Sequence, residues 1–423
     1  MTHRRLTFRR VLAVLVLLVF ALVSSGSADT RPPLDQGLDR VTAGEQFSLL
    51  YWEVGALGDL ASRSIAPGYI PGQNPAADRN AVVRYAQLTG DLGQISAERD
   101  RVEATTNDPS QLAKLNQQAN TISAELQSLR PIVETVVAWQ IEQVQISDGI
   151  RHGVVGLQPS SSFPFFGVQV DPPVAFTIGE TPELLAVAPR DRIELIDTVL
   201  LNPNLSFRQV DRTESGTDAL GVSSVVLGIG GLAAYPAMIP GTSSVTFLLQ
   251  TAAHEWTHHY LAFRPLGQAY FGSYDMRTIN ETVADMVGQE LGQQVYARYY
   301  SPPLPPWPEP APAPATSQPA KPTFDDLMRS IREHVAAMLA KGDVAGADAY
   351  MAAQQKELAR DGYYVRVLNT AYLSFFGAYA GSGNPYEARL RALRKSSGSL
   401  AAFLQTVSQV SNPSQLPPAP AGG

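Results

Sequence analysis

One segment of the chain, residues 254–258, constrains both its local structure and its chemistry. It reads His-Glu-Trp-Thr-His, so two histidines stand four residues apart, with a glutamate directly after the first. Because residues i and i+4 share one face of an α-helix, the imidazoles of His254 and His258 can reach a single point. Such a pair typically holds Zn²⁺, and Glu255 is placed to take a proton from a water molecule at the metal. We therefore expect a helix over Val245–Phe263 that supplies two metal ligands.

Composition limits the other ways in which this chain can bind a metal or a partner. The 423 residues include six histidines and no cysteine, which excludes disulfides, thiolate metal sites and a lipid-modified cysteine. Any metal ligand must therefore be a histidine or a carboxylate. A hydrophobic content of 44% and a charged content of 17% indicate a globular protein. The net charge of −7 argues against nucleic acid as a partner.

The first segment, residues 1–28, has the pattern of a secretory signal peptide. Four arginines precede the apolar run Val11–Val23, and small residues follow it in Ser24–Ala28. A run of about 13 residues is short for a bilayer span and typical of a signal peptide. The alternative is an uncleaved anchor that attaches the protein to a membrane. Both interpretations predict an extracytoplasmic protein, either secreted or membrane-anchored and facing outward.

Residues 29–155 should form a helical region. A short apolar helix is expected around Phe47–Leu60, and two heptad runs follow at Ala81–Val102 and Leu112–Leu129. A polar turn, Thr105–Pro109, separates the two runs, so they predict an antiparallel helical hairpin. We expect this hairpin to be a packing or stalk element. A prodomain or a partner-docking arm is the alternative.

Residues 156–300 should form the catalytic domain of an α+β protein. Short runs rich in β-branched or aromatic residues predict a small mixed sheet; they are Phe165–Val170, Val174–Ile178, Leu184–Ala188 and Val222–Leu227. Leu232–Met238 is expected to be an exposed edge strand, interrupted by Pro236, that could pair with an extended peptide. The glycines of Gly228–Gly231 lack the spacing and the strand–helix–strand context of a phosphate loop.

Three further segments complete the expected organisation. Residues 301–322 are rich in proline and predict an extended linker or a surface insertion. Residues 323–411 should form a C-terminal helical subdomain, with its strongest helical pattern at Tyr363–Tyr379. Residues 412–423 are rich in Pro, Ala and Gly and predict a disordered tail.

The third metal ligand should come from a second helix, expected at Ile279–Gln293. A continuation of the motif with a third histidine is excluded, because Leu261 and Arg264 occupy its glycine and histidine positions. Glu281 and Asp285 lie four residues apart on one helical face. Glu281 can complete a set of two histidines and one carboxylate, and Asp285 can accept the free ring N–H of a ligand histidine.

With these residues the chain resembles the gluzincin clan of zinc metallopeptidases, which includes thermolysin and the zinc aminopeptidases. Thermolysin-like members carry N-E-x-x-x-D after H-E-x-x-H, and Asn280–Asp285 matches that pattern. The resemblance implies a zincin-like catalytic domain with a small mixed sheet, an active-site helix and a glutamate helix. It implies these roles: zinc ligands His254, His258 and Glu281, the general base Glu255, and the supporting residues Asp285 and Asn280.

The chain departs from the clan in two respects. It has no G-A-M-E-N or similar signature in the edge-strand region, which argues against a standard aminopeptidase. No motif identifies the Tyr or His that stabilises the transition state in the clan. A helix expected at Val365–Tyr379 places Asn369 and Tyr372 on one face, so we expect Tyr372 first and Tyr364 second in that role. Ordinary core packing is the alternative for both tyrosines.

Several residues of this region also fit purely structural roles. Thr278 and Glu281 have the Thr-x-x-Glu spacing of a capping box, although the neighbouring motifs favour a ligand role for Glu281. His259 points about 100° away from His258 on a helix and should be a packing or surface residue. The remaining histidines are expected to have no catalytic role; they are His3, His152 and His334.

The sequence thus predicts an extracytoplasmic zinc metallopeptidase that hydrolyses peptide bonds in peptides or proteins. Two alternatives remain open at this point. One is a non-catalytic cell-surface binding or scaffold protein with a structural zinc site, against which the unliganded Glu255 argues. The other is a zinc hydrolase of a non-peptide amide.

Overall fold

The computed structural model describes residues 33–65, 69–151, 156–159, 168–301, 322–379 and 386–418. The predicted signal segment and residues 302–321 of the proline-rich segment lie outside them. The chain divides into two compact units, Met1–Gly44 and Glu45–Gly423. The described part of the first unit is a single helix, α2 (Pro33–Val41), with the turn that follows it. The second unit contains helices and small sheets, so the α+β class is confirmed.

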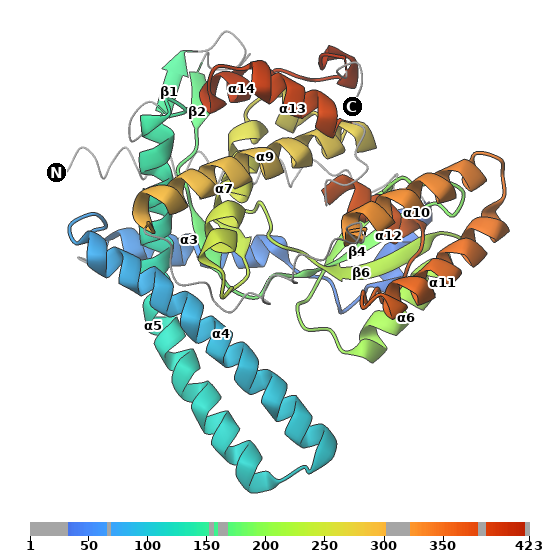
Figure 1. The fold of residues 1–423 in the computed structure, drawn as a ribbon, viewed down its shortest axis with the longest axis horizontal. Coiled ribbons are helices and arrows are strands. Elements are labelled where there is room, and N and C mark those ends of the chain that lie inside the picture. Colours follow the sequence, from blue (N-terminus) through green and yellow to red (C-terminus); the bar gives the residue numbers. More distant parts are fainter. Residues whose placement is uncertain are drawn as a thin grey trace, which may run out of the picture. The chain divides into compact units, whose positions relative to one another are not determined.

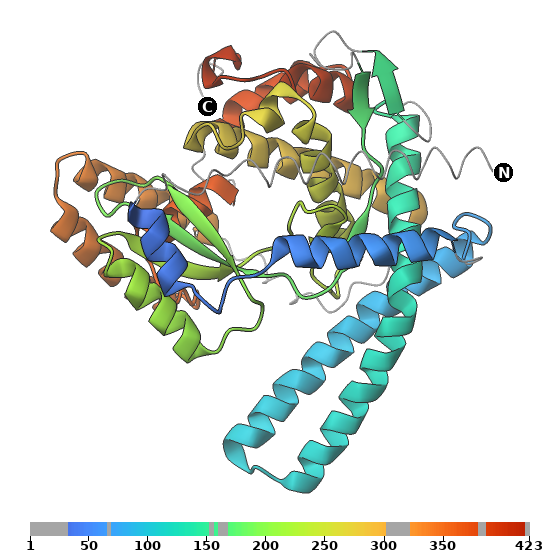
Figure 2. The same cartoon turned by 180° about the vertical axis from the view of Figure 1, so that it is seen from behind.

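The predicted helical hairpin is present in the second unit, after helix α3 (Leu49–Ile65). It consists of α4 (Pro75–Thr105) and α5 (Pro109–Ser147) (Figure 1). The turn between them places Asn107 at φ +46°, and the Asp108 carboxylate caps α5 by accepting the backbone N–H of Ser110 at 2.8 Å. The view from behind in Figure 2 shows the two helices side by side along their length.

The described strands form three small sheets instead of the one mixed sheet that was predicted. β4 (Glu183–Ala188) lies between β5 (Asp197–Leu201) and β6 (Ser223–Gly228), with antiparallel pairing on both sides. β3 (Phe176–Ile178) pairs in parallel with β7 (Ala237–Ile239), and β1 (Gly156–Pro159) pairs with β2 (Val168–Asp171). The periodicity missed β1, β5 and the polar helix α6 (Phe207–Asp218).

The prediction of a single exposed strand over Leu232–Met238 was wrong. Leu232 and Met238 exchange backbone hydrogen bonds of 2.8 and 2.9 Å, so the chain folds back on itself between them. β7 is fully buried, and both of its edges are paired, one with β3 and the other with Leu232. The backbone that could pair with an extended peptide is therefore that around Leu232, not that of β7.

Both edges of the three-stranded sheet are already occupied. At the β6 edge, Asn369 donates its amide to the Ser224 carbonyl at 2.8 Å, and Arg366 donates to the Val226 carbonyl at 3.0 Å. At the β5 edge, the Phe47 N–H donates to the Leu200 carbonyl at 2.9 Å. These contacts leave little of this sheet free to pair with an extended peptide.

The C-terminal part is mostly helical, as predicted. Its elements are α10 (Phe324–Leu339), α11 (Val344–Arg360), α12 (Thr370–Tyr379), α13 (Glu387–Ser396), α14 (Leu400–Val407) and the 3₁₀ turn η1 (Pro413–Gln415). Two details differ from expectation. α12 begins at Thr370, because Asn369 caps it by accepting the Tyr372 N–H at 2.9 Å. Residues 412–418 are ordered, because Arg389 donates to carbonyls of this segment and Leu416 is buried.

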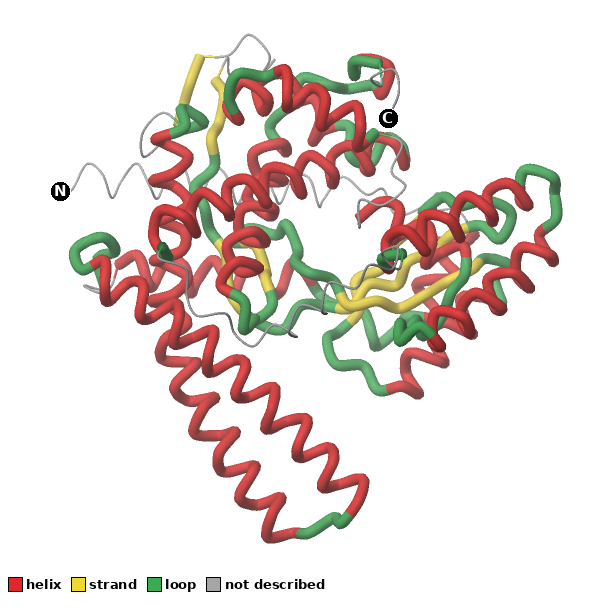
Figure 3. The backbone as a smooth tube through the Cα atoms, in the orientation of Figure 1, coloured by secondary structure: helices red, strands yellow, loops and turns green. Residues whose placement is uncertain are grey.

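Two helices at the centre of the second unit position the candidate site: α7 (Val245–Ala262) and α9 (Tyr274–Tyr299) (Figure 3). Their close approach requires glycine on α9. A β-carbon at Gly288 would lie 2.8 Å from the Gln250 carbonyl oxygen and 3.0 Å from the His254 β-carbon. Gly292 packs against Gln250 in the same way. The histidines of α7 therefore face the carboxylates of α9 across a nearly backbone-to-backbone contact.

Candidate metal centre

The helix predicted around the first motif is α7. Ser244 caps its first turn by accepting the Phe247 N–H at 3.2 Å, and apolar residues including Leu248, Leu249 and Ala253 bury one side. Trp256 is also buried, and its indole N–H donates to the Pro172 carbonyl at 2.9 Å. These contacts fix the rotation of α7 about its axis.

The helix predicted around the second motif is α9, and it begins five residues earlier than expected. Its N-cap is Ser273, whose hydroxyl accepts the Met276 N–H at 3.1 Å. Thr278 lies inside the helix, where its hydroxyl donates to the Tyr274 carbonyl at 2.9 Å. The capping-box explanation for Glu281 is therefore excluded, and its carboxylate is buried for another reason.

Three side-chain atoms from the two helices converge on one point. The Nε2 atoms of His254 and His258 are 3.1 Å apart, and Oε2 of Glu281 lies 3.6 Å from the first and 3.3 Å from the second. Zinc bonds of about 2.0–2.1 Å at tetrahedral angles hold ligand atoms about 3.3 Å apart. The spacing and the donor types therefore both fit a zinc ion with three protein ligands.

The other ring nitrogen of each histidine is held by a residue of α9. Nδ1 of His254 lies 2.9 Å from Oδ1 of Asp285, and Nδ1 of His258 lies 2.9 Å from Oδ1 of Asn280. A hydrogen bond at Nδ1–H leaves the lone pair on Nε2, the nitrogen that faces the convergence point. We call His254, His258 and Glu281 the triad. Helix α9 thus supplies the carboxylate of the triad and the partners that orient both imidazoles.

Glu255 is buried beside the triad, at 4% exposure. Its carboxylate packs directly on Gly231, where an added β-carbon would lie 2.0 Å from Oε1 of Glu255. No role was predicted for Gly231, because the glycines of Gly228–Gly231 lack the spacing of a phosphate loop. Its packing role depends on a contact between segments far apart in the chain, which glycine spacing does not reveal.

Tyr270 is a residue of the site that no sequence motif predicted. It lies in the loop between α8 (Pro265–Gln268) and α9, and its hydroxyl donates to Oε1 of Glu281 at 2.6 Å. Its ring stands edge-on to that of His258, with centroids 6.3 Å apart. The only sequence signal was an aromatic pair, Tyr270 and Phe271, shortly before the glutamate helix.

The charges of the site shift the pKa values of its members. Burial acts to raise the pKa of Glu281, but the His258 charge and the hydrogen bonds of both histidines outweigh it and lower that pKa. Burial acts to lower the pKa of His254, yet its bonds to Asp285 and Glu281 hold it well above the ordinary value. For Glu255, burial dominates over the opposing charges of the two histidines and raises the pKa.

The two tyrosines expected to stabilise the transition state lie on α12 and in the segment before it. Tyr364 is 88% exposed, and Tyr372 stacks on Phe376 with ring centroids 6.2 Å apart. In the part of the chain that the structure describes, neither makes a hydrogen bond or a ring contact with a residue of the triad. Ordinary packing accounts for Tyr372, which packs against an apolar cluster that includes residues of α10, α11 and α12.

Of the remaining histidines, the structure describes His259 and His334, and neither belongs to the triad. His259 is buried, and its Nε2 lies 2.6 Å from the Ala234 carbonyl oxygen. Burial lowers its pKa to about 4. His334 is exposed on α10 and stacks on Tyr350. His3 and His152 lie outside the described residues.

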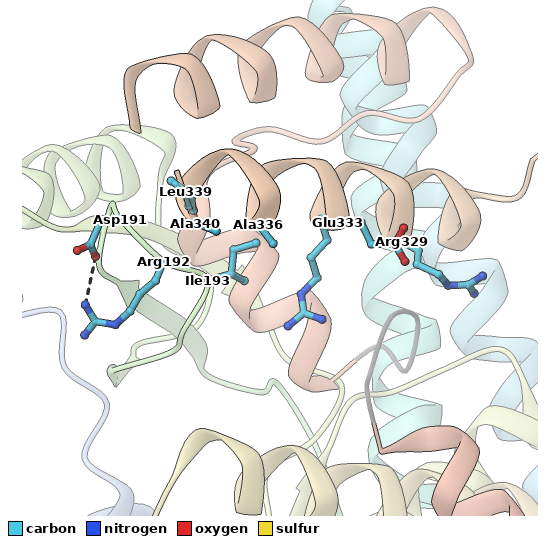
Figure 4. Close-up of a pocket in the computed structure, with 9 residues that line it drawn as sticks. Asp191, Arg192, Ile193, Arg329, Glu333, Ala336, Leu339 and Ala340 are labelled. Carbon is cyan, nitrogen blue, oxygen red and sulfur yellow. Dashed lines mark hydrogen bonds and ion pairs between the residues drawn. The ribbon is translucent and has the colours of Figure 1, made fainter. Parts of the chain in front are cut away.

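A surface cavity of about 430 Å³ lies apart from the triad residues, between the β4–β5 loop and α10 (Figure 4). Its lining is formed by Asp191, Arg192, Ile193, Arg329, Arg332, Glu333, Ala336, Leu339 and Ala340. Arg192 pairs with Asp191 at 3.1 Å and with Glu194 at 2.5 Å. Arg192 thus forms ion pairs with carboxylates of the same chain. No residue of the triad lines this cavity.

The chain was also compared with known proteins. No family model, no curated protein and no solved structure matches it. The geometry of α7 and α9 is therefore the main indication of its chemistry. That geometry brings together three groups that could hold a metal ion, with a carboxylate beside them and hydrogen bonds to both imidazoles from α9.

Proposed function

We propose that this protein is an extracytoplasmic zinc metallopeptidase of the gluzincin type. The observation that carries the proposal is the convergence of the His254, His258 and Glu281 ligand atoms, with both imidazoles oriented by α9. The described cluster has three members, whereas structural zinc sites usually close all four positions with protein ligands. A three-ligand set leaves a position for water or substrate and favours catalysis over a purely structural role.

A bound zinc ion acidifies a water molecule and polarises a substrate carbonyl. The residues around it then provide the proton transfers. Glu255 would take a proton from the attacking water and pass it to the leaving amine. A group with both tasks works best when its pKa lies closer to neutral than that of an ordinary glutamate. The burial of Glu255 against Gly231 shifts its pKa in that direction.

The backbone beside Glu255 favours an extended peptide as the substrate. The N–H and the carbonyl of Leu232 are both hydrogen-bonded to Met238 of β7. In antiparallel pairing, the N–H and the carbonyl of the preceding residue, Gly231, therefore point away from β7. A peptide strand paired with Gly231 would pass the carboxylate of Glu255, because Gly231 contacts it. A non-peptide amide has no extended backbone to use this edge.

The proposed location rests on the N-terminal sequence alone. Residues 1–28 have the charge and apolar pattern of a secretory signal peptide or an N-terminal anchor. Among the helices that the structure describes, none has the length and hydropathy of a membrane span. An uncleaved N-terminal segment would attach the catalytic part to the outer face of the membrane.

A peptide library with mass-spectrometric detection tests the proposal. The full chain, loaded with zinc, should cleave a subset of peptides, and a chelator should abolish the cleavage until zinc is restored. The Glu255→Gln variant should bind zinc but lose activity by about 10²–10⁴-fold. Cleavage that survives chelation, or equal activity in the variant and the parent, would rule out this mechanism.

A further inference from the structure

The two carboxylate oxygens of Glu281 have different partners. Oε2 faces the Nε2 atoms of both histidines, at 3.6 Å from His254 and 3.3 Å from His258. Oε1 instead accepts the hydroxyl of Tyr270 at 2.6 Å. A carboxylate can bind a metal through one oxygen or both, so this division of partners bears on how many ligand atoms the site offers.

The Tyr270 ring is held in place by its surroundings. Its N–H donates to the Gly267 carbonyl at 3.1 Å, in a turn so tight that a β-carbon at Gly267 would lie 2.1 Å from the Leu261 carbonyl oxygen. The guanidinium of Arg277 lies 5.5 Å from the ring centroid, and the Phe271 ring packs edge-on at 4.9 Å. These contacts fix the ring and the backbone of Tyr270, and its hydroxyl donates to Oε1 of Glu281.

We propose that Tyr270 is a positioning residue that restricts Glu281 to a single metal-ligand oxygen and so keeps the site four-coordinate. The inference rests on the metal site of the proposed function. A hydrogen bond from the phenol draws electron density from Oε1 and holds it away from the convergence point. Oε2 then remains as the one carboxylate ligand, and with two imidazoles it leaves the fourth position open for water.

Removal of the hydroxyl should change the metal site without removing a ligand. In Tyr270→Phe the ring contacts with Phe271 and Arg277 are retained, but the hydrogen bond to Oε1 is lost. Both oxygens of Glu281 can then approach the metal, which raises the coordination number. The carboxylate also loses its fixed orientation, and the loss of such a supporting contact typically weakens metal affinity 10–100-fold.

Cobalt provides the test, because four-coordinate Co²⁺ absorbs visible light several-fold more strongly than five- or six-coordinate Co²⁺. The full chain is loaded with Co²⁺ and its spectrum is recorded for the parent, for Tyr270→Phe and for the control Tyr51→Phe. Tyr51 lies on α3 and is 84% exposed, so its variant removes a hydroxyl with no role at the site. Zinc affinity is measured in parallel by competition with a chromophoric chelator.

The parent and Tyr51→Phe should give intense four-coordinate spectra, and Tyr270→Phe a weaker spectrum with zinc affinity lowered 10–100-fold. A weak, higher-coordinate spectrum in the parent would overturn the inference without any variant. So would Tyr270→Phe with an unchanged spectrum and affinity. If the spectra change as expected but no peptide is cleaved, the inference stands and the peptidase proposal fails.

Discussion

Oδ1 of Asp285 lies 2.9 Å from Nδ1 of His254, so a carboxylate one turn beyond Glu281 on α9 orients an imidazole on α7. The bond presents Nε2 of His254 to the convergence point. Replacement of Asp285 by asparagine keeps the shape but removes the charge. We expect the zinc affinity of Asp285→Asn to fall 10–100-fold, as measured by competition with a chelator.

Asp361→Asn is the control for this variant. Asp361 is exposed and follows the last residue of α11, and no described hydrogen bond or ion pair joins it to α7 or α9. Its variant should bind zinc as the parent does. Equal zinc affinities for Asp285→Asn and Asp361→Asn would mean that Asp285 does not support the site.

Substitution of Gly231 should displace the carboxylate of Glu255 without changing metal binding. A methyl group at this position would lie 2.0 Å from Oε1 of Glu255, so in Gly231→Ala the carboxylate must move. The three atoms nearest to that added carbon all belong to Glu255. Peptide hydrolysis should fall by at least about 10²-fold, with zinc content unchanged. Gly230→Ala is a matched control, because a β-carbon at Gly230 meets nothing within 4 Å. Equal rates for the two variants would disprove the role of Gly231.

Gly288 sets the distance between α7 and α9. A β-carbon there would lie 2.8 Å from the Gln250 carbonyl oxygen, on the rigid backbone of α7. We expect Gly288→Ala to lower the free energy of unfolding by about 1–3 kcal/mol in urea titrations of the metal-free protein. In contrast, Gly93→Ala on α4 meets nothing within 4 Å and should stabilise the protein by about 0.5–1 kcal/mol. A stabilising Gly288→Ala would show that the interface can relax.

The central helices could be predicted because their chemistry follows from local spacing. His254 and His258 share a face at a separation of four residues, as do Glu281 and Asp285. No long-range information was needed to place each pair on a helix. The contact between the two helices needed glycines at 288 and 292, whose purpose is visible only when α7 is present beside them.

The residues that were missed, or expected in the wrong place, depend on tertiary contacts. Tyr270 reaches Glu281 from a loop, and Gly231 reaches Glu255 from a distant segment, so neither has a sequence period. The apolar pattern after Tyr363 predicted a helix from Val365. The ion pair of Arg366 with Glu214 and its hydrogen bond to the Val226 carbonyl instead hold this stretch against β6 without helical structure. Long-range hydrogen bonds thus override local helical preference there.

His259 gives the protein a predicted pH dependence of stability. Its folded pKa of about 4 lies below the ordinary value of 6.5, because the ring is buried. Between these two values His259 binds more protons in the unfolded chain than in the folded protein. Its contribution to stability is therefore full above pH 6.5 and declines as the pH falls toward 4. Urea titrations from pH 7 to pH 4 should show this loss. It should shrink in His259→Gln but persist in His334→Gln, which replaces an exposed histidine. The same slope in both variants would assign the effect to other groups.

The zinc content of the purified full chain tests the central claim most directly. If His254, His258 and Glu281 form a metal centre, elemental analysis should find about one zinc ion per folded chain after dialysis. His258→Ala should retain its fold, as judged by circular dichroism, and lose that zinc. A folded parent that binds no zinc, or a His258→Ala variant that keeps a full equivalent, would contradict the account.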